Sequence, residues 1–135
     1  MERSFGILPM QKHKEGYSIF LVHHQKGHWA VPKGRKEGDE EDRKAAEREL
    51  EEETGLQVVS YIREEPFVER YSFCREGAKI EKEVLYFLAE VTGSVRLQEE
   101  EIQDGGWFSF QEAIERVTFK QGEDLVRNAF TVLDK

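Results

Sequence analysis

Five segments of the chain are rich in apolar, β-branched and aromatic residues and are bounded by polar turn residues, a pattern that is typical of β-strands. The charged stretch at residues 75–82 separates two of these segments and predicts a hairpin loop. Residues 27–38 contain Pro and Gly breakers and are expected to be irregular, and a short strand is expected at residues 105–108. The long strands are expected at residues 4–8, 17–23, 57–62, 67–74 and 83–91.

Three helices are expected between and after these strands. Asp39 is a good N-cap for the first helix, and Gly55 stands at the usual position just past its end. Ser109 and Glu112 form a capping-box pattern ahead of the second helix. Because helices interrupt a larger number of strands, we expect an α/β (α+β) fold with a mixed sheet and helices on its faces. The helices are expected at residues 40–54, 113–117 and 123–133.

The length of 135 residues is enough for one domain with its own core, and we expect a single domain over residues 1–135. Nine Phe, four Tyr and two Trp argue against disorder. A single Cys excludes an intrachain disulfide and suits a cytoplasmic protein. Residues 1–10 do not resemble a signal peptide, and no apolar run is long enough to span a bilayer, so we expect no membrane partner.

Acidic residues are concentrated in one part of the chain. The formal net charge is −8, and residues 37–53 hold ten acidic residues and three basic ones. An acidic protein binds nucleic acid poorly, because counterion release needs basic groups. On a helical wheel the carboxylates of Glu49, Glu52 and Glu53 fall among the few apolar positions, which indicates a site for a hard cation. Considered alone, such a helix is more often a solvated surface with salt bridges.

A wider spacing decides between these two interpretations. Gly34 is followed after five residues by Glu40, and after seven more by Arg-Glu-Leu-Glu-Glu-Glu-Thr-Gly-Leu at residues 48–56. This resembles the signature of the Nudix hydrolase family, which is G, five residues, E, seven residues, then R-E-aliphatic-x-E-E-x-G-aliphatic. Every fixed position is matched. The resemblance implies an α/β/α sandwich with a mixed central β-sheet, and the expected order of elements suits that fold over essentially the whole chain.

The resemblance also implies hydrolysis of a nucleoside diphosphate that is linked to another group, with Mg²⁺ as cofactor and Mn²⁺ as a possible substitute. Arg48 would pair with Glu40 and fix the loop against the helix. Either Glu52 or Glu101 would activate water, and Glu101 is chosen from an acidic run because it stands six residues before Trp107. The catalytic set is thus Glu52, Glu101 and Arg48. The metal set is the Gly34 carbonyl with Glu49, Glu52, Glu53 and Glu101.

Two further segments resemble the asymmetrical diadenosine tetraphosphate hydrolases of that family. Residues 29–34 match a W-x-x-P-K-G lead-in that RNA 5′-pyrophosphohydrolases share, and residues 82–89 match a K-x-V-x-Y-aromatic-L-A strand. Under this resemblance Lys82 contacts a polyphosphate oxygen, and Tyr86 offers a hydroxyl or a ring face. An aromatic residue would stack the base. The substrate set is Lys33, Lys82, Tyr86 and Phe119.

From the residues alone, plainer alternatives remain open for this set. Either Tyr86 or Phe87 packs in the core, because neighbours in a strand face opposite sides. Phe119 could equally be a core residue, and without the resemblance Lys82 would be taken as a surface lysine. Cys74 is assigned no chemistry, and the three clustered histidines do not follow a zinc spacing. Those histidines are His23, His24 and His28.

The resulting hypothesis is a cytoplasmic, monomeric, Mg²⁺-dependent hydrolase that converts diadenosine tetraphosphate to ATP and AMP. Its partner is a dinucleoside polyphosphate substrate. One alternative is an RNA 5′-pyrophosphohydrolase or another nucleoside polyphosphate hydrolase, although the chain has no obvious basic stripe to follow RNA. A second alternative is a sensor that binds a nucleotide without cleaving it. The complete set of carboxylates argues against a sensor.

Overall fold

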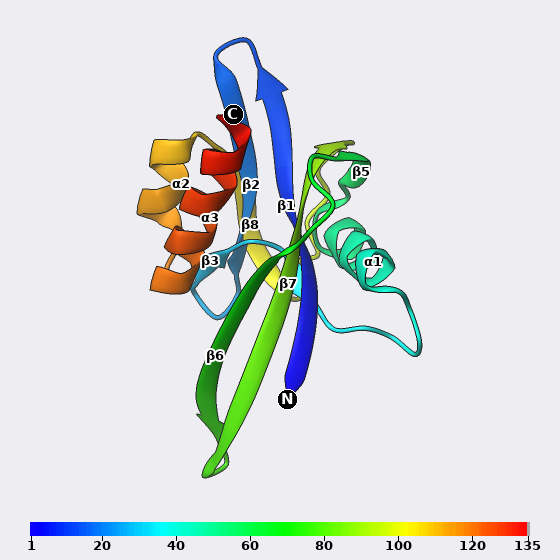
Figure 1. Cartoon of the computed structure of the whole chain (residues 1–135), viewed down its shortest axis with the longest axis vertical. Coiled ribbons are helices and arrows are strands. Elements are labelled where there is room, and N and C mark those ends of the chain that lie inside the picture. Colours follow the sequence, from blue (N-terminus) through cyan, green and yellow to red (C-terminus); the bar gives the residue numbers. More distant parts are fainter. Residues whose placement is uncertain (135) are drawn as a thin grey trace.

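The computed structural model describes residues 1–134. A mixed β-sheet lies between α1 on one side and the pair α2 and α3 on the other, which confirms the predicted layers (Figure 1). No helix in the described residues is both long enough and apolar enough to cross a membrane. The elements are β1 (Glu2–His13), β2 (Gly16–His24), β3 (Trp29–Ala30), β4 (Lys33–Gly34), α1 (Asp42–Thr54), β5 (Gln57–Tyr61), β6 (Phe67–Arg75), β7 (Ala78–Thr92), β8 (Ile102–Phe108), α2 (Phe110–Arg116) and α3 (Lys120–Leu133).

The sheet is mixed because β1 runs parallel to β7, while the other pairings are antiparallel. Its main path is β3-β2-β1-β7-β5, with β8 beside β2 and β6 beside β7. The two-residue strand β4 pairs with β1, so that Lys33 lies opposite Gly6 and Gly34 opposite Phe5. This pairing brings the segment before α1 onto the centre of the sheet.

Both faces of the sheet are buried, and the alternation of side chains along β7 supplies both cores. Val84 and Leu88 belong to a cluster that includes residues of α2 and α3. Leu85 and Phe87 point the other way and pack with Leu50 of α1. Because successive residues of a strand alternate in this way, a continuous apolar run fits a central strand covered by helices on both sides.

The start of α1 differs from the prediction, whereas its end agrees. The helix begins at Asp42, with Glu41 at the N-cap and no side-chain cap, so the assignment of Asp39 as N-cap is wrong. The preceding turn is closed instead by the Glu40 carboxylate, which accepts a hydrogen bond from the Glu37 N–H at 2.8 Å. Gly55 adopts the left-handed conformation, with φ of 80°, and terminates the helix as expected.

The β6–β7 hairpin is present but longer than predicted, because most of the expected loop at residues 75–82 continues the two strands. Only Glu76 and Gly77, both with positive φ, form the turn. The polar residues of this stretch are paired through backbone hydrogen bonds, and the two strands extend beyond the rest of the sheet as an arm (Figure 1). At the other end of the chain, the capping box of Ser109 and Glu112 is formed as predicted.

Candidate functional site

Glu53 is a buried carboxylate in the last turn of α1. Its side chain is 1% exposed, and neither carboxylate oxygen has a hydrogen-bond partner among residues 1–134. Burial raises its pKa to about 9, and the nearby charges of Glu49 and Glu101 act in the same direction. An acid held in this way is costly for folding, which indicates that the position serves another purpose.

Glu49 lies one turn earlier and packs directly against β4. A β-carbon built on Gly34 would lie 2.0 Å from the carboxyl carbon of Glu49, so a larger residue there would displace this carboxylate. The Glu49 side chain is 17% exposed. Burial raises its pKa, and the Arg48 guanidinium opposes that shift. The Gly34 backbone and the Glu49 carboxylate of the helix are therefore in close contact.

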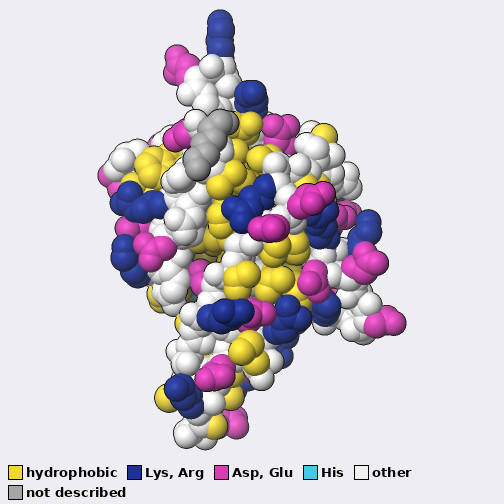
Figure 2. Space-filling view, viewed as in Figure 1, with side chains coloured by type: hydrophobic (Ala, Val, Ile, Leu, Met, Phe, Trp, Pro, Cys, Tyr) yellow, Lys and Arg dark blue, Asp and Glu magenta, His cyan; other side chains and the backbone are white. Residues whose placement is uncertain are grey.

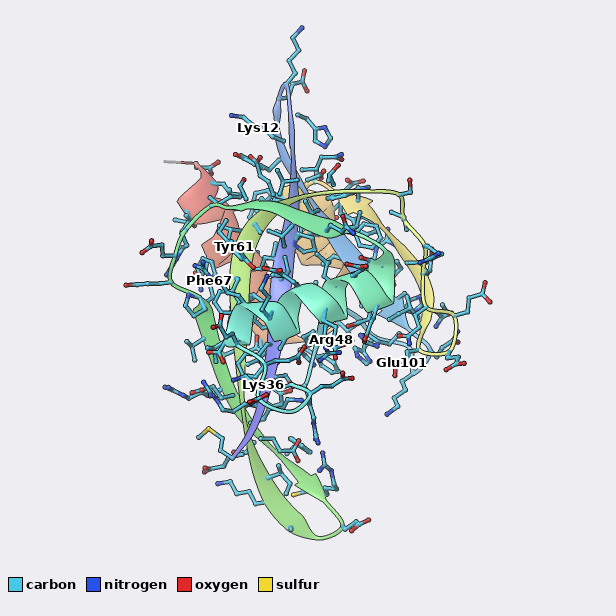
Figure 3. The ribbon with its side chains drawn as sticks, turned by 90° about the vertical axis from the view of Figure 1, so that its right-hand side faces the viewer. Lys12, Lys36, Arg48, Tyr61, Phe67 and Glu101 are labelled. Carbon is cyan, nitrogen blue, oxygen red and sulfur yellow. The ribbon has the colours of Figure 1, made fainter. Side chains whose placement is uncertain are left out.

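Arg48 connects the loop before α1 to the carboxylates of the helix. Its Nε donates to Glu40 Oε2 at 2.9 Å and its Nη2 donates to Glu40 Oε1 at 3.1 Å, so the two side chains form a bidentate ion pair. Nη2 also donates to the Arg35 carbonyl at 2.7 Å. Arg48 lies on the side of α1 that faces this loop (Figure 3). The expected Arg48–Glu40 pair is thus found, and its hydrogen bonds lower the pKa of Glu40.

Glu52 is the most accessible of the three predicted metal ligands on α1. Its side chain is 48% exposed, and its Oε2 accepts a hydrogen bond from Arg48 Nη1 at 3.1 Å. The same nitrogen donates to Glu49 Oε1 at 3.1 Å. Arg48 therefore lies between two of the carboxylates and partly neutralises them.

Glu101 lies far from α1 in the sequence but close to its end in space. The loop before β8 is tied to the helix, because the Gln98 N–H donates to the Glu53 carbonyl at 3.1 Å. The Glu101 N–H in turn donates to the Gln98 carbonyl at 3.1 Å. The exposed Glu101 side chain is close enough for its charge to raise the pKa of Glu53. The structure thus brings the chosen residue of the acidic run toward the helix (Figure 3).

The arrangement fits a divalent cation in its chemistry, although no three His, Cys, Asp or Glu side chains in residues 1–134 already form a metal site. Two features support the fit: the unpaired oxygens of Glu53, and the close approach of Glu49 to Gly34. Hard cations prefer such carboxylate and carbonyl oxygens. Glu52 would have to turn away from Arg48 to join them, and its exposure leaves room for that rotation.

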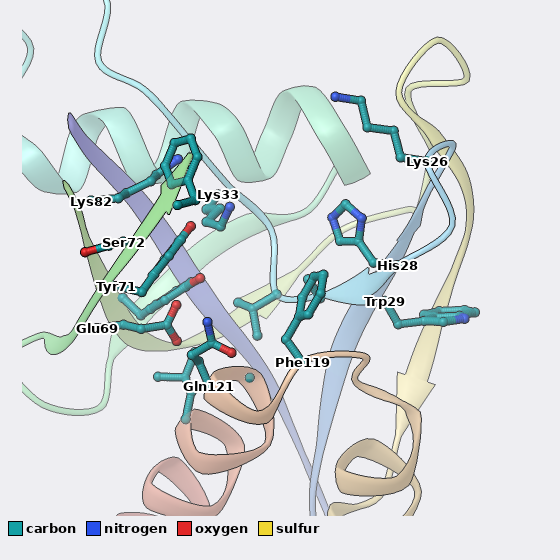
Figure 4. A pocket seen from close by; sticks show the side chains of 16 residues that line it. Lys26, His28, Trp29, Lys33, Glu69, Tyr71, Ser72, Lys82, Phe119 and Gln121 are labelled. Atoms are coloured by element: carbon teal, nitrogen blue, oxygen red, sulfur yellow. The ribbon is translucent and has the colours of Figure 1, made fainter. Parts of the chain in front are cut away.

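A cavity of about 590 Å³ opens on the side of the sheet that carries α3. The four residues of the predicted substrate set, Lys33, Lys82, Tyr86 and Phe119, all line it (Figure 4). They come from β4, β7 and the segment before α3, which are well separated along the chain. Lys33 is adjacent to Gly34, so the cavity and the carboxylates of α1 meet at β4.

Two lysines give the cavity its basic side. Lys33 lies opposite Gly6, and Lys82 lies opposite Glu2, on the two strands that flank β1. Burial and the charge of Lys33 lower the pKa of Lys82, as expected when two cations share one partly buried space. A bound polyanion would relieve this repulsion. Lys82 is therefore not a simple surface lysine.

Phe119 forms an aromatic wall rather than part of the core, so the core alternative for this residue is wrong. Its side chain is 54% exposed, and its ring centroid lies 5.6 Å from that of His28, which also lines the cavity. His28 is stacked in turn on His24, with ring centroids 4.2 Å apart. The histidines thus stack with neighbouring rings and, within the described residues, form no metal group.

Tyr86 and Phe87 are both buried, at 3% and 4% exposure, but on opposite faces of the sheet. Only Tyr86 borders the cavity, and burial raises its pKa well above the usual range. Cys74 is an exposed free thiol in β6. Both residues therefore pack in a core, where only one was expected, and Tyr86 alone also lies at the cavity.

Two cavity residues, and a glycine that packs against the cavity residue Tyr86, were not singled out from the sequence. Gly6 of β1 is required because a β-carbon there would lie 2.5 Å from the Pro32 carbonyl and 3.0 Å from the Tyr86 ring. Glu69 of β6 and Gln121 of α3 line the cavity near Phe119 and on the side away from Lys82 (Figure 4). None of the three has a local signal, apart from the alternation that places Glu69 on the same face as Tyr71.

Comparisons with known proteins identify related sequences. The asymmetrical bis(5′-nucleosyl)-tetraphosphatases of Rattus norvegicus and Mus musculus are 34% and 33% identical to this chain over 97 residues. The aligned part is 70% of this chain and 64% of each relative, so the chain spans less than two thirds of their length.

Solved structures share the fold. The binary complex of the C. elegans Ap4A hydrolase has a TM-score of 0.75 at 23% identity, covering 97% of this chain and 96% of that one. The NUDIX domain of Shewanella oneidensis NrtR, complexed with ADP ribose, has a TM-score of 0.79 at 14% identity, covering 97% and 87%. The NUDIX domain family model matches residues 1–128. Together with the complete signature on α1, this match shows that the chain belongs to the Nudix family.

Proposed function

We propose that the chain is a Mg²⁺-dependent hydrolase that cleaves diadenosine tetraphosphate asymmetrically into ATP and AMP. The observation that carries the proposal is the junction at β4. Lys33 borders a cavity with a basic and an aromatic side, and the next residue, Gly34, abuts the carboxylate of Glu49. A polyphosphate bound in the cavity would thus reach the acidic helix.

The carboxylates of Glu49, Glu52 and Glu53, with the Gly34 carbonyl and Glu101, are the proposed ligands of the cation. When bound, Mg²⁺ would supply charge neutralisation on the phosphate oxygens and increase the acidity of water. Glu52 or Glu101 would accept the proton of the attacking water, whose oxygen bonds to phosphorus as the bridging P–O bond breaks. Arg48 acts indirectly by holding the loop and two of the carboxylates in place.

The cavity side of the proposal assigns Lys33 and Lys82 to phosphate oxygens, Tyr86 to a phosphate or base contact, and Phe119 to stacking on a base. Stacking suits a purine, since it needs only a flat polarizable face. With one base held by Phe119 and the phosphates leading toward α1, the arrangement has no internal symmetry. We therefore expect attack away from the middle of the phosphate chain.

Chromatography of the reaction products tests this directly. The purified protein is incubated with diadenosine tetraphosphate and Mg²⁺ in water enriched in ¹⁸O. The nucleotides are then separated, and their masses are measured by mass spectrometry. Equal amounts of ATP and AMP are expected, with one ¹⁸O atom in one product. Two equivalents of ADP, or no turnover, would contradict the proposal. Glu51→Gln should give the same products at the same rate as the wild type, since Glu51 is on the exposed side of α1.

An RNA 5′-pyrophosphohydrolase is the alternative with the same chemistry. On the face shown in Figure 2, basic and acidic side chains are interspersed rather than gathered into a basic stripe. That pattern favours a small substrate, because an RNA strand would need a row of basic groups. Faster release of pyrophosphate from triphosphorylated RNA than cleavage of the dinucleotide would reverse this preference.

The proposal also includes a monomeric state and a cytoplasmic location, where the free thiol of Cys74 would remain reduced.

A further inference from the structure

The cavity contains a carboxylate that does not suit a pocket for phosphate alone. Glu69 projects from β6 into a space that is also lined by three lysines, namely Lys26, Lys33 and Lys82. Among the lining residues in the described part of the chain, Glu69 is the one acid. A negative charge beside a polyphosphate is unfavourable, so this side chain must face a different part of the ligand.

The protein itself leaves the Glu69 carboxylate without a partner. Residues 1–134 provide it with no hydrogen bond or ion pair. Burial raises its pKa, and the charge of Lys33 opposes this shift. A second cavity of about 240 Å³ lies behind Glu69, so its carboxylate is also not enclosed by apolar packing. Its acceptor oxygens are therefore available to donors from a bound molecule.

Gln121 shares this corner of the cavity. Gln121 and Glu69 line both cavities together, which places them side by side on the wall between the two spaces. Gln121 is in the first turn of α3, two residues after Phe119. In Figure 4 the two polar side chains approach each other across from the lysine side, and the Phe119 ring borders the same space. A base stacked on Phe119 would point an edge toward them.

We propose that Glu69, together with Gln121, reads the edge of the stacked base and favours guanine over adenine; this rests on the proposed nucleotide function of the same cavity. An ionised carboxylate only accepts hydrogen bonds. Guanine offers it two adjacent donors, N1–H and the N2 amine, and the amide of Gln121 can donate to O6. Adenine offers one donor, the N6 amine, beside the acceptor N1, which the carboxylate would repel.

The preference is measured as the ratio of kcat/KM for diguanosine tetraphosphate to that for diadenosine tetraphosphate. One bidentate pair discriminates between bases by roughly tenfold or more, so a ratio of about 10 or above is expected for the wild type. Glu69→Gln should reduce the ratio to about 1 or below, because an amide also matches adenine. Diinosine tetraphosphate, which lacks the N2 amine, should lie between the two substrates. Glu65→Gln, a change at an exposed acid outside both cavities, should leave the ratio unaltered.

Two outcomes would overturn the inference while the hydrolase proposal stands. The first is a wild-type ratio near 1 that Glu69→Gln does not change. The second is an equal loss for all three substrates in Glu69→Gln, which would place the carboxylate at the ribose or in a structural role. If neither dinucleotide is cleaved, calorimetric titration of GDP and ADP in chelator still decides the matter. Tighter binding of GDP that is lost in Glu69→Gln supports base reading, and equal affinities refute it.

Discussion

The carboxylate of Glu49 lies where a side chain at position 34 would be, because a β-carbon on Gly34 would be 2.3 Å from each of its oxygens. A larger residue at this position of the Nudix signature would thus displace the Glu49 carboxylate. The same approach brings the Gly34 backbone close to a carboxylate, and carbonyl and carboxylate oxygens are both ligands suited to a hard cation.

Gly34→Ala should therefore displace Glu49 and lower kcat by about 100-fold or more, the size of effect expected when a group is misplaced by about 1 Å. Steady-state kinetics with Mg²⁺ measures the loss, and circular dichroism shows whether the fold is retained. Gly106→Ala is the control, since a β-carbon there meets its nearest neighbour at 3.5 Å. Equal activity in both variants would remove Gly34 from the site.

Glu53→Gln should stabilise the metal-free protein while abolishing most of its activity. The folded pKa of Glu53 is raised to about 9, so between its unfolded value near 4.5 and pH 9 the folded state binds more protons than the unfolded state. Stability from this group therefore falls as the pH rises through that window. Removing the charge should raise the free energy of unfolding by on the order of 1–3 kcal/mol at neutral pH.

Urea unfolding in chelator at several pH values between 5 and 9 measures this effect, and the advantage of Glu53→Gln over the wild type should grow with pH. Its kcat should fall by about 10²–10⁴-fold. A variant less stable than the wild type at every pH would show that the buried carboxylate is not the costly group inferred here.

Mg²⁺ or Mn²⁺ should raise the melting temperature of the protein after chelator treatment, since a ligand that binds only the folded state stabilises it. The folded state itself should survive in chelator, because its two apolar cores do not involve the carboxylate cluster. Glu52→Gln should reduce the metal-induced shift, whereas Glu51→Gln should retain it. Differential scanning fluorimetry over a metal titration distinguishes them, and equal shifts would count against Glu52 as a ligand.

Arg48→Lys should destabilise the fold and slow the reaction, although it keeps the charge. A lysine has a single side-chain nitrogen, so it cannot reproduce the hydrogen bonds that Nε and Nη2 of Arg48 make to Glu40 and to the Arg35 carbonyl. Losing hydrogen bonds to a charged group should cost about 1–3 kcal/mol of unfolding free energy. Denaturant titration tests this against Arg127→Lys, an exposed helical pair with Glu123 for which little change is expected.

Phe119→Ala should weaken substrate binding without affecting stability, because the ring is 54% exposed and contributes little to the core. Loss of base stacking should cost about 1–3 kcal/mol in binding. The expected result is a higher KM for diadenosine tetraphosphate and a smaller change for inorganic triphosphate, which has no base. An equal change for both compounds would indicate that Phe119 shapes the cavity rather than stacking on a base.

The sequence was sufficient for the features that depend on local spacing. The helical period placed Glu49 and Glu53 correctly toward the packed side of α1, although it placed Glu52 there too, and that side chain is 48% exposed. A glycine in the left-handed conformation ends the helix at Gly55. Helix and strand types followed from patterns that act within a few residues. The same local rules failed at Asp39: the helix begins at Asp42, and Glu40 before it is paired with Arg48, eight residues further along the chain.

The tertiary structure decided what sequence spacing cannot express. Glu52 and Glu53 are neighbours of the same residue type, yet one is half exposed and the other is buried beneath the loop that carries Glu101. Gly6 and Glu69 acquire their roles only because β1 pairs in parallel with β7, and β6 folds back on β7 to complete the cavity wall. Burial and electrostatic environment depend on contacts between segments far apart in the chain, so they arise only when the sheet is assembled.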